Sequence, residues 1–298
     1  MRVIITGANG FVGSSLVDKF VDNGIEVLAI DVSLAHPKFK ASKLISTIES
    51  DLQKIDEIKR TIGTKQYDIF YNLAWRGVNG PDKTKFDIQI KNIETSLRGA
   101  ELAKALGCKK YLCAGTVAER AIESLPFLKK TSPGMMYAAA KYSNRIMLEN
   151  YCKSIGLDYV WMQFSNIYGP TNKTGNLVSY TLTKLGQNLE ATFGPAEQPY
   201  DFIYIADLIE AVFRLGVKNT SKHFYFIGSG SPLVLKEYLL KIGAAFGKPH
   251  LIRIGAREDD NIKYSFEMMS ISDTVHDIGV YTSGSFDELI KYTIENIS

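Results

Sequence analysis

Cysteine and histidine are scarce in this sequence, and neither kind of residue is grouped. The 298 residues include three cysteines, Cys108, Cys113 and Cys152, and no CxxC pair. So few thiols argue against a disulfide framework and favour a reducing compartment, which we expect to be the cytoplasm. The 4 histidines stand singly at no metal-ligand spacing, so we predict no metal site.

Long apolar runs and an excess of one charge are also missing. No stretch approaches the ~18 apolar residues of a membrane span. The apolar run at residues 3–5 is too short for a signal peptide. Lys and Arg number 35 against 32 Asp and Glu, which gives a net charge of +3. This balance argues against a nucleic-acid or membrane partner.

The sequence does contain a regular alternation of two patterns. Short apolar runs predict strands over residues 3–5, 27–30, 44–48, 69–74, 111–114 and 159–164. Between these runs apolar residues recur at helical spacing. For example, one helix that ends near Gly107 is expected to bury a face made of Ile90, Ile93, Leu97 and Ala100. Strands that alternate with helices predict a doubly wound parallel sheet of the α/β class.

Three glycines follow the first predicted strand. Gly7, Gly10 and Gly13 have the spacing G-x-x-G-x-x-G between that strand and the next helix. The first permits a tight turn, the second lets the backbone approach a pyrophosphate, and the third lets the helix pack on the strand. The anion would lie on the free N–H groups at the start of the helix. We therefore predict a Rossmann-type dinucleotide site.

An acidic residue ends the second predicted strand. A carboxylate in the place of Asp31 accepts hydrogen bonds from ribose hydroxyls and repels a 2′-phosphate. No Lys or Arg follows at once, because residues 32–34 are Val, Ser and Leu. We therefore predict NAD as the cofactor, in preference to NADP.

A tyrosine and a lysine stand four residues apart on a later predicted helix. Tyr137 and Lys141 share one helical face, with three alanines between them. A nearby ammonium, together with the positive charge of an oxidised nicotinamide, would favour the phenolate form of tyrosine. Tyr137 is then a candidate general acid/base. The alternative is an ordinary packing tyrosine, and the glycine loop argues for the catalytic interpretation.

These motifs together resemble the extended short-chain dehydrogenase/reductase family, in its nucleotide-sugar epimerase and dehydratase branch, over nearly the whole chain. The matching segments are Thr6–Gly13, Asp31, Asp51-Leu52, Asn72–Trp75, Asn92, Tyr137–Lys141, Asn166–Pro170 and Tyr200–Asp207. The resemblance implies that NAD contacts Gly7, Asn9, Gly10, Phe11, Val12, Gly13, Asp31, Asp51, Leu52, Leu73, Ala74, Asn92, Tyr137, Lys141, Phe164 and Ile167.

The same resemblance implies a third catalytic residue and a set of substrate contacts. Thr116 matches the family's Ser or Thr at the end of the fifth strand, although a register shifted by two residues would place Ala114 there. Arg257 is either a diphosphate-binding residue or a solvated arginine beside an acidic run. The implied contacts of a nucleotide-sugar are Trp75, Arg76, Thr116, Asn166, Asn176 and Arg257.

Departures from the family pattern bear on the reaction. The Asp-Glu pair that follows the Thr in 4,6-dehydratases is Val117-Ala118 here, which argues against dehydration. A sugar C4 epimerase working through a keto intermediate and an NAD(P)H-dependent 4-keto-sugar reductase both remain open. Asp31 disfavours NADPH and so favours the epimerase. A non-catalytic NAD-binding protein would not need Thr116, Tyr137 and Lys141.

The motifs also divide the chain. We expect a dinucleotide-binding domain over residues 1–165, and a smaller, mainly substrate-binding lobe over residues 166–298. The first domain should also take segments near 200–228, with strands at 202–205 and 224–227. In the family, helices matching residues 84–106 and 137–154 pack against their symmetry mates, so the resemblance implies a homodimer.

Overall fold

A parallel sheet forms the centre of the computed structural model, which describes residues 1–123, 134–172, 175–259 and 264–297. Within these residues, seven strands are ordered β11-β6-β5-β4-β1-β2-β3, and all neighbours are parallel. The strands are β1 (Arg2–Thr6), β2 (Glu26–Asp31), β3 (Ile45–Glu49), β4 (Ile69–Asn72), β5 (Lys110–Thr116), β6 (Asp158–Phe164) and β11 (Phe224–Ile227). The predicted α/β class is thus confirmed, and the sheet changes direction of growth between β1 and β4.

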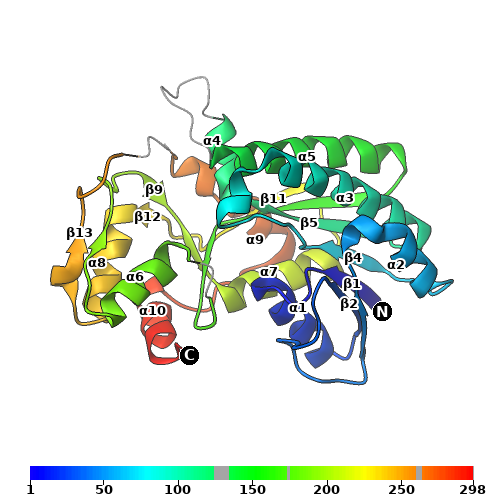
Figure 1. Ribbon diagram of the computed structural model, residues 1–298, viewed down its shortest axis with the longest axis horizontal. Coiled ribbons are helices and arrows are strands. Elements are labelled where there is room, and N and C mark those ends of the chain that lie inside the picture. The colour runs from blue at the N-terminus through cyan, green and yellow to red at the C-terminus, as the bar shows by residue number, and fades with distance from the viewer. Residues whose placement is uncertain (124–133, 173–174, 260–263, 298) are drawn as a thin grey trace.

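Helices cover both faces of this sheet, because its strands are apolar on both sides (Figure 1). Along β1, Val3 and Ile5 point into one core and Ile4 into the other, as the alternation of a strand requires. The first core packs under α1 (Phe11–Asp22), α7 (Ile205–Val217) and α9 (Ser272–Ile278). The second packs under α2 (Ile55–Ile62), α3 (Phe86–Ala105) and α5 (Met135–Ser154).

The orientation of α3 differs from the sequence-based expectation. Ile90 was expected in the buried face, but its residue is 61% exposed. The buried side of α3 carries mostly small or polar residues instead, namely Gln89, Ser96, Gly99, Ala100, Leu102 and Ala103. Polar contacts rather than apolar spacing set this rotation, since Asn72 Nδ2 donates to Ser96 Oγ over 3.2 Å and Gln89 bonds the preceding loop.

A smaller lobe with its own apolar core lies beside the sheet, on the left of Figure 1. Its helices are α6 (Leu177–Gly186), α8 (Leu235–Ala245) and α10 (Phe286–Glu295). Its short strands pair as β7 (Asn166–Tyr168) with β10 (Phe202–Tyr204), β9 (Pro199–Tyr200) with β12 (Leu233–Val234), and β8 (Ala191–Thr192) with β13 (Ile252–Arg253).

The chain returns from this lobe to the central sheet after residue 204. The strand expected at 202–205 is β10, which pairs with β7 and not with the central sheet. Ile205 already begins α7, which packs against α1. The strand expected at 224–227 is β11, which joins the sheet beside β6.

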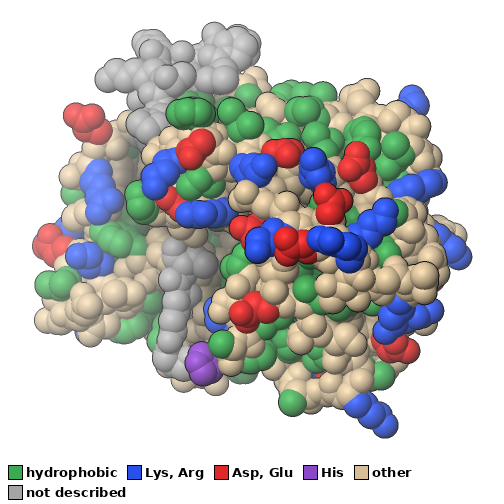
Figure 2. Space-filling view, turned by 45° about the vertical axis from the view of Figure 1, so that its right-hand side comes forward, with side chains coloured by type: hydrophobic (Ala, Val, Ile, Leu, Met, Phe, Trp, Pro, Cys, Tyr) green, Lys and Arg blue, Asp and Glu red, His purple; other side chains and the backbone are tan. Residues whose placement is uncertain are grey.

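Short helical turns connect several of these elements. They are η1 (Leu52–Lys54), η2 (Pro81–Thr84), η3 (Val117–Glu119), α4 (Arg120–Glu123), η5 (Pro249–Leu251) and η6 (Glu267–Met269). In the described part of the chain, none of the helices has the length and apolar character needed to cross a membrane. Figure 2 shows Lys and Arg side chains interspersed with Asp and Glu over the face that it presents.

Candidate active site

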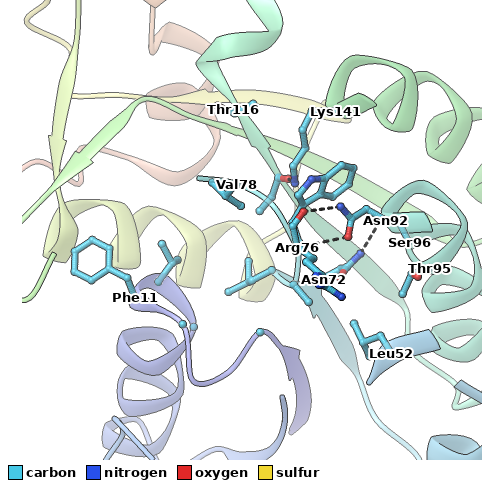
Figure 3. A pocket seen from close by; sticks show the side chains of 18 of the residues that line it. Phe11, Leu52, Asn72, Arg76, Val78, Asn92, Thr95, Ser96, Thr116 and Lys141 are labelled. Carbon is cyan, nitrogen blue, oxygen red and sulfur yellow. Dashed lines mark hydrogen bonds between the residues drawn. The ribbon is translucent and has the colours of Figure 1, made fainter. Parts of the chain in front are cut away.

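A cavity of about 900 Å³ opens where the parallel strands end at their carboxyl edge. Figure 3 shows Thr116 and Lys141 at one end of it, with Phe11 and Leu52 on other sides. This edge is where ligands bind in open α/β sheets. The predicted residues that line it are Gly7, Gly10, Phe11, Val12, Gly13, Asp31, Asp51, Leu52, Leu73, Ala74, Trp75, Arg76, Asn92, Thr116, Tyr137, Lys141, Phe164, Asn166, Ile167 and Asn176.

The glycine loop is packed so closely that side chains cannot replace its hydrogens. Gly7 has φ +70, and a Cβ there would lie 2.8 Å from Ala74 N. A Cβ on Gly13 would lie 2.0 Å from the carbonyl oxygen of Gly7. Gly10 is the N-cap residue before α1, and the described residues supply no side-chain cap for the first N–H groups of this helix. The start of α1 is therefore open to an anion, which fits the pyrophosphate of a dinucleotide.

Asp31 closes the same loop from the end of β2. Its Oδ2 accepts a hydrogen bond of 2.9 Å from the backbone N–H of Asn9. The Asn9 side chain lies outside the cavity lining and donates to the carbonyl oxygens of Ser33 and His36. Asn9 therefore ties the glycine loop to the segment after β2, while Asp31 Oδ1 accepts from Ser33 N over 3.4 Å and the residue lines the cavity.

Polar side chains of α3 hold the loop that follows β4. Asn92 makes a reciprocal pair with the backbone of Arg76, donating to its carbonyl over 2.8 Å and accepting from its N–H over 3.0 Å (Figure 3). Gln89, only 1% exposed, accepts from Trp75 Nε1 over 2.9 Å. These bonds fix the Trp75 indole at the cavity.

Thr116, Tyr137 and Lys141 converge at the end of the cavity. Thr116 ends β5 and is hydrogen-bonded through its side chain to Tyr137, while its Oγ1 also accepts from Ala118 N over 3.3 Å. Lys141 Nζ donates to the carbonyl oxygen of Ala114 over 2.7 Å and lies 3.8 Å from the Trp75 ring centre. A hydroxyl, a phenol and an ammonium are thus available together for proton transfer.

Burial sets the protonation of these groups. Burial raises the pKa of Tyr137 above its ordinary 10.0, while the Thr116 hydrogen bond lowers this pKa by less. Burial lowers the pKa of Lys141 from 10.5 to about 8, against the raising effect of Cys113 and Glu119. In the protein without ligand, Tyr137 is therefore a phenol and Lys141 mostly an ammonium at neutral pH.

The predicted substrate contacts are distributed over two places. Asn166 Oδ1 accepts from Tyr200 OH over 3.1 Å, and Asn176 caps α6 while donating to the Ile167 carbonyl over 2.6 Å. Both line the cavity. Arg257 does not line it. Arg257 donates instead to Thr192 Oγ1 over 2.8 Å and to Tyr180 OH over 2.7 Å in the smaller lobe.

Sequence reasoning missed three polar residues around the site. Lys83 Nζ lies 5.5 Å from the centre of the Tyr137 ring, Gln89 holds Trp75, and Glu119 accepts from the backbone N–H of Thr116 over 2.7 Å. Gln89 and Lys83 take part in contacts of the segment between β4 and α3, which the periodicity of apolar residues does not predict. Glu119 had one local signal, because it follows Thr116 at the spacing of a capping box, which the structure contains.

The fold and the glycine loop define a dinucleotide-binding class of protein, and Tyr137 lines the same cavity. A model of the NAD dependent epimerase/dehydratase family matches residues 3–228. The chain therefore belongs to the NAD-dependent epimerase/dehydratase family. It is an enzyme of nucleotide-sugar chemistry, and its cofactor is NAD. The described residues contain no group of His, Cys, Asp and Glu suited to a metal ion.

Individual relatives cover nearly the whole chain at low identity. A UDP-glucose 4-epimerase of Mycolicibacterium smegmatis is 25% identical over 268 residues, which cover 84% of either chain. A dTDP-4-dehydro-6-deoxyglucose reductase of Escherichia coli is 23% identical and covers 97% of this chain and 96% of its own. The structure of a UDP-N-acetylglucosamine 4-epimerase from Methanobrevibacter ruminantium superposes with TM-score 0.81 at 22% identity, covering 99% and 97%.

Proposed function

We propose that this enzyme is a nucleotide-sugar epimerase that inverts sugar C4 through a keto intermediate, with Tyr137 as acid/base. The observation that carries the proposal is the junction of Thr116, Tyr137 and Lys141 in one cavity with the glycine loop. The loop and Asp31 would hold NAD, with Asp51, Leu52, Leu73, Ala74, Asn92, Phe164 and Ile167 along it. Bound NAD supplies a reversible hydride acceptor.

The protein's own residues would move one proton in both directions. Tyr137 takes the proton of the C4 hydroxyl as C4 is oxidised, and returns it after the keto sugar has turned over. The Lys141 ammonium and a positive nicotinamide favour the phenolate that this step needs, against the burial that raises the pKa of Tyr137. Thr116 shares the proton through its hydrogen bond to Tyr137.

The residues after Thr116 argue against dehydration. Val117 is 6% exposed and packs with Phe226 and Met269, away from the cavity. Ala118 has no acid/base group, and the described cavity lining does not include Glu119. No carboxyl group therefore stands beside Thr116 in the cavity to remove or donate a proton during loss of water.

The sugar and the diphosphate would occupy the part of the cavity between the sheet and the smaller lobe. Trp75 and Arg76 line its side at β4, and Asn166 and Asn176 line its side at the lobe. Arg257 would reach a diphosphate only by leaving Thr192 and Tyr180. We assign it the weakest role of the predicted contacts.

Two further assignments follow the same family. Large apolar side chains stay exposed on α3 and α5, which pack together on one face of the sheet, and they are Phe86, Ile90, Met136, Ile146 and Met147. Such a face fits a homodimer in which these helices meet their copies. All three cysteines are free and buried, which suits a reducing compartment such as the cytoplasm.

A screen of UDP-, dTDP-, GDP- and CDP-sugars with the NAD-loaded enzyme tests the reaction. An epimerase converts one sugar into its C4 epimer with no net change in NADH absorbance. The reductase named among the relatives makes the alternative concrete. In a parallel assay with added NADH and a 4-keto sugar, stoichiometric oxidation of NADH without epimer formation would replace the epimerase with that alternative.

A further inference from the structure

A buried carboxylate lies directly behind the reactive end of the cavity. Glu119, in η3, is 0% exposed. Its Oε1 accepts from Thr116 N over 2.7 Å, and its Oε2 accepts from Trp161 Nε1 over 3.0 Å and from Gln163 Nε2 over 3.3 Å. Arg145 Nε lies 3.9 Å from the same Oε2. The carboxylate is therefore anchored from β5, β6 and α5 at once.

Gly115 leaves space for the Glu119 carboxylate. A Cβ on Gly115 would lie 2.3 Å from Trp161 Nε1 and 2.8 Å from Glu119 Oε1, so only glycine leaves room for their hydrogen bond. Burying a carboxylate costs free energy unless partners replace its water, and an apolar residue would need no such partners. Retention of a charge here, beside the apolar Val117, calls for a role beyond packing.

Glu119 lies close to the reactive groups, because the Trp161 side chain that donates to its Oε2 has its ring centre 5.9 Å from Lys141 Nζ. Glu119 raises the pKa of Lys141 and also that of Tyr137, in both cases as a smaller effect than burial. The other titratable or charged groups that face Glu119 or Lys141 come from three elements. They are Cys113 on β5, Tyr137 and Arg145 on α5, and Tyr159 on β6, while Glu123 on α4 pairs with Arg145 and so forms a further layer of charge.

Gln163 lets Glu119 hold either protonation state. The amide oxygen of Gln163 is buried and has no hydrogen-bond partner among the described residues. Its amide nitrogen serves the carboxylate, whereas rotation of the amide would offer its oxygen to a protonated Glu119. Burial also raises the pKa of Glu119 above its ordinary value. The protonated form of Glu119 therefore has a hydrogen-bond acceptor available, the amide oxygen of Gln163.

We propose that Glu119 is a positioning residue, whose carboxylate fixes the backbone of Thr116 and supplies the negative charge that keeps Lys141 protonated beside Tyr137. The inference rests on the proposed acid/base role of Tyr137 and Lys141. Its test reads the titration of Lys141 itself and needs no sugar substrate. Failure of this inference is therefore distinguishable from failure of the epimerase proposal.

The test is competitive labelling of Lys141 with a small amine reagent across pH, read by peptide mass spectrometry in the full-length protein. Wild type should give a midpoint of about 8. Removal of the charge in Glu119→Gln should lower the midpoint by about one pH unit, the low end of the effect of an opposite charge. The control Glu123→Gln removes a charge from the same Arg145 without contact to Thr116, and should leave the midpoint in place.

A second variant guards against misfolding. The new amide of Glu119→Gln would face the Trp161 indole N–H, and two donors would meet. The double variant Glu119→Gln with Trp161→Phe removes that donor, and Trp161→Phe alone is its reference. A lower Lys141 midpoint in the double variant than in its reference supports the proposal. Equal midpoints in these folded proteins would overturn it.

Discussion

At the scale of single residues, the surroundings of Tyr137 oppose the ionised form that its proposed role requires. Its phenol is buried and hydrogen-bonded to Thr116, and Lys83 Nζ lies 5.5 Å from the centre of its ring. Burial favours the neutral phenol. In the proposed mechanism the phenolate would therefore depend on positive charge from Lys141 and from bound NAD. Proton transfer would therefore be coupled to cofactor binding.

Replacement of the phenol isolates that role. Tyr137→Phe should lower turnover by at least ~100-fold, the usual contribution of a general acid/base. NAD affinity, measured by calorimetry, should change little because the ring and its packing remain. The variant Tyr142→Phe, at a nearby half-buried tyrosine, provides a control with the same loss of one hydroxyl. Full turnover in Tyr137→Phe would remove Tyr137 from the mechanism.

A second residue, Asp31, should decide between cofactors. Asp31→Asn keeps an acceptor for the Asn9 N–H but removes the charge that repels a 2′-phosphate. The preference for NAD over NADP should fall by at least ~10-fold, or ~1.4 kcal/mol. Glu49→Gln removes an equal charge from the neighbouring strand, outside the cavity lining, and should preserve the preference. An unchanged ratio of dissociation constants in Asp31→Asn would refute the assignment.

Most of the residues that line the cavity could be predicted from the sequence, but the residues that hold them in place could not. Tyr137 and Lys141 are adjacent on a helix whatever the tertiary structure, and Thr116 follows a strand that points to the cavity. Glu119 is different, because its burial depends on Trp161 and Gln163, more than 40 positions later. Such a contact exists only after β5 and β6 have paired.

Among the elements, the strands were predictable and the faces of the helices less so. The seven strands of the sheet all coincide with apolar runs, although β4 ends at Asn72 and not at Ala74. Helix α3 shows the limit, since Ile90 lies outside while Gln89 and Ser96 lie inside. The spacing of apolar residues does not show which side of a helix is buried when hydrogen bonds determine its orientation. It also does not show that apolar residues remain exposed on an outer face for contact with a partner.

The junction of β1 and α1 is the element most sensitive to change. Gly13→Ala would place a Cβ 2.0 Å from the Gly7 carbonyl oxygen and push α1 from the sheet. We expect a lower melting temperature and NAD affinity reduced at least ~10-fold. Gly186→Ala in α6 is the matched control, because its Cβ would meet nothing within 4 Å. Equal effects of the two substitutions would show that the loop does not need its close packing.

In the whole molecule, the cavity draws on both the sheet and the smaller lobe. A domain limit near residue 165 stays a prediction from the change in loop residues. Of the two strands predicted to return to the first domain, residues 224–227 join the central sheet as β11, whereas residues 202–204 pair with β7 instead. Arg257 illustrates what remained beyond prediction, since it lies with Tyr180 and Thr192. Its position depends on how the β8 and β13 strands pair within the lobe.

The proposed homodimer is also a property of the whole molecule. Ile90→Glu places a charge on the exposed face of α3 and should convert a dimer into a monomer in light scattering. Leu240→Glu alters a residue of α8 that is 46% exposed, and should leave the dimer intact. A monomeric wild-type protein, or a dimer that persists in Ile90→Glu, would contradict the assigned interface.

The most direct measurement of the proposed reaction is nuclear magnetic resonance of the nucleotide-sugar product formed in deuterated water by the NAD-loaded enzyme. Epimerisation through a keto sugar predicts a C4 epimer that keeps its original hydrogen at C4, with no net change in NADH. Tyr137 exchanges only the hydroxyl proton with solvent in this account. Deuterium at C4, or NADH that accumulates in step with a keto product, would contradict it.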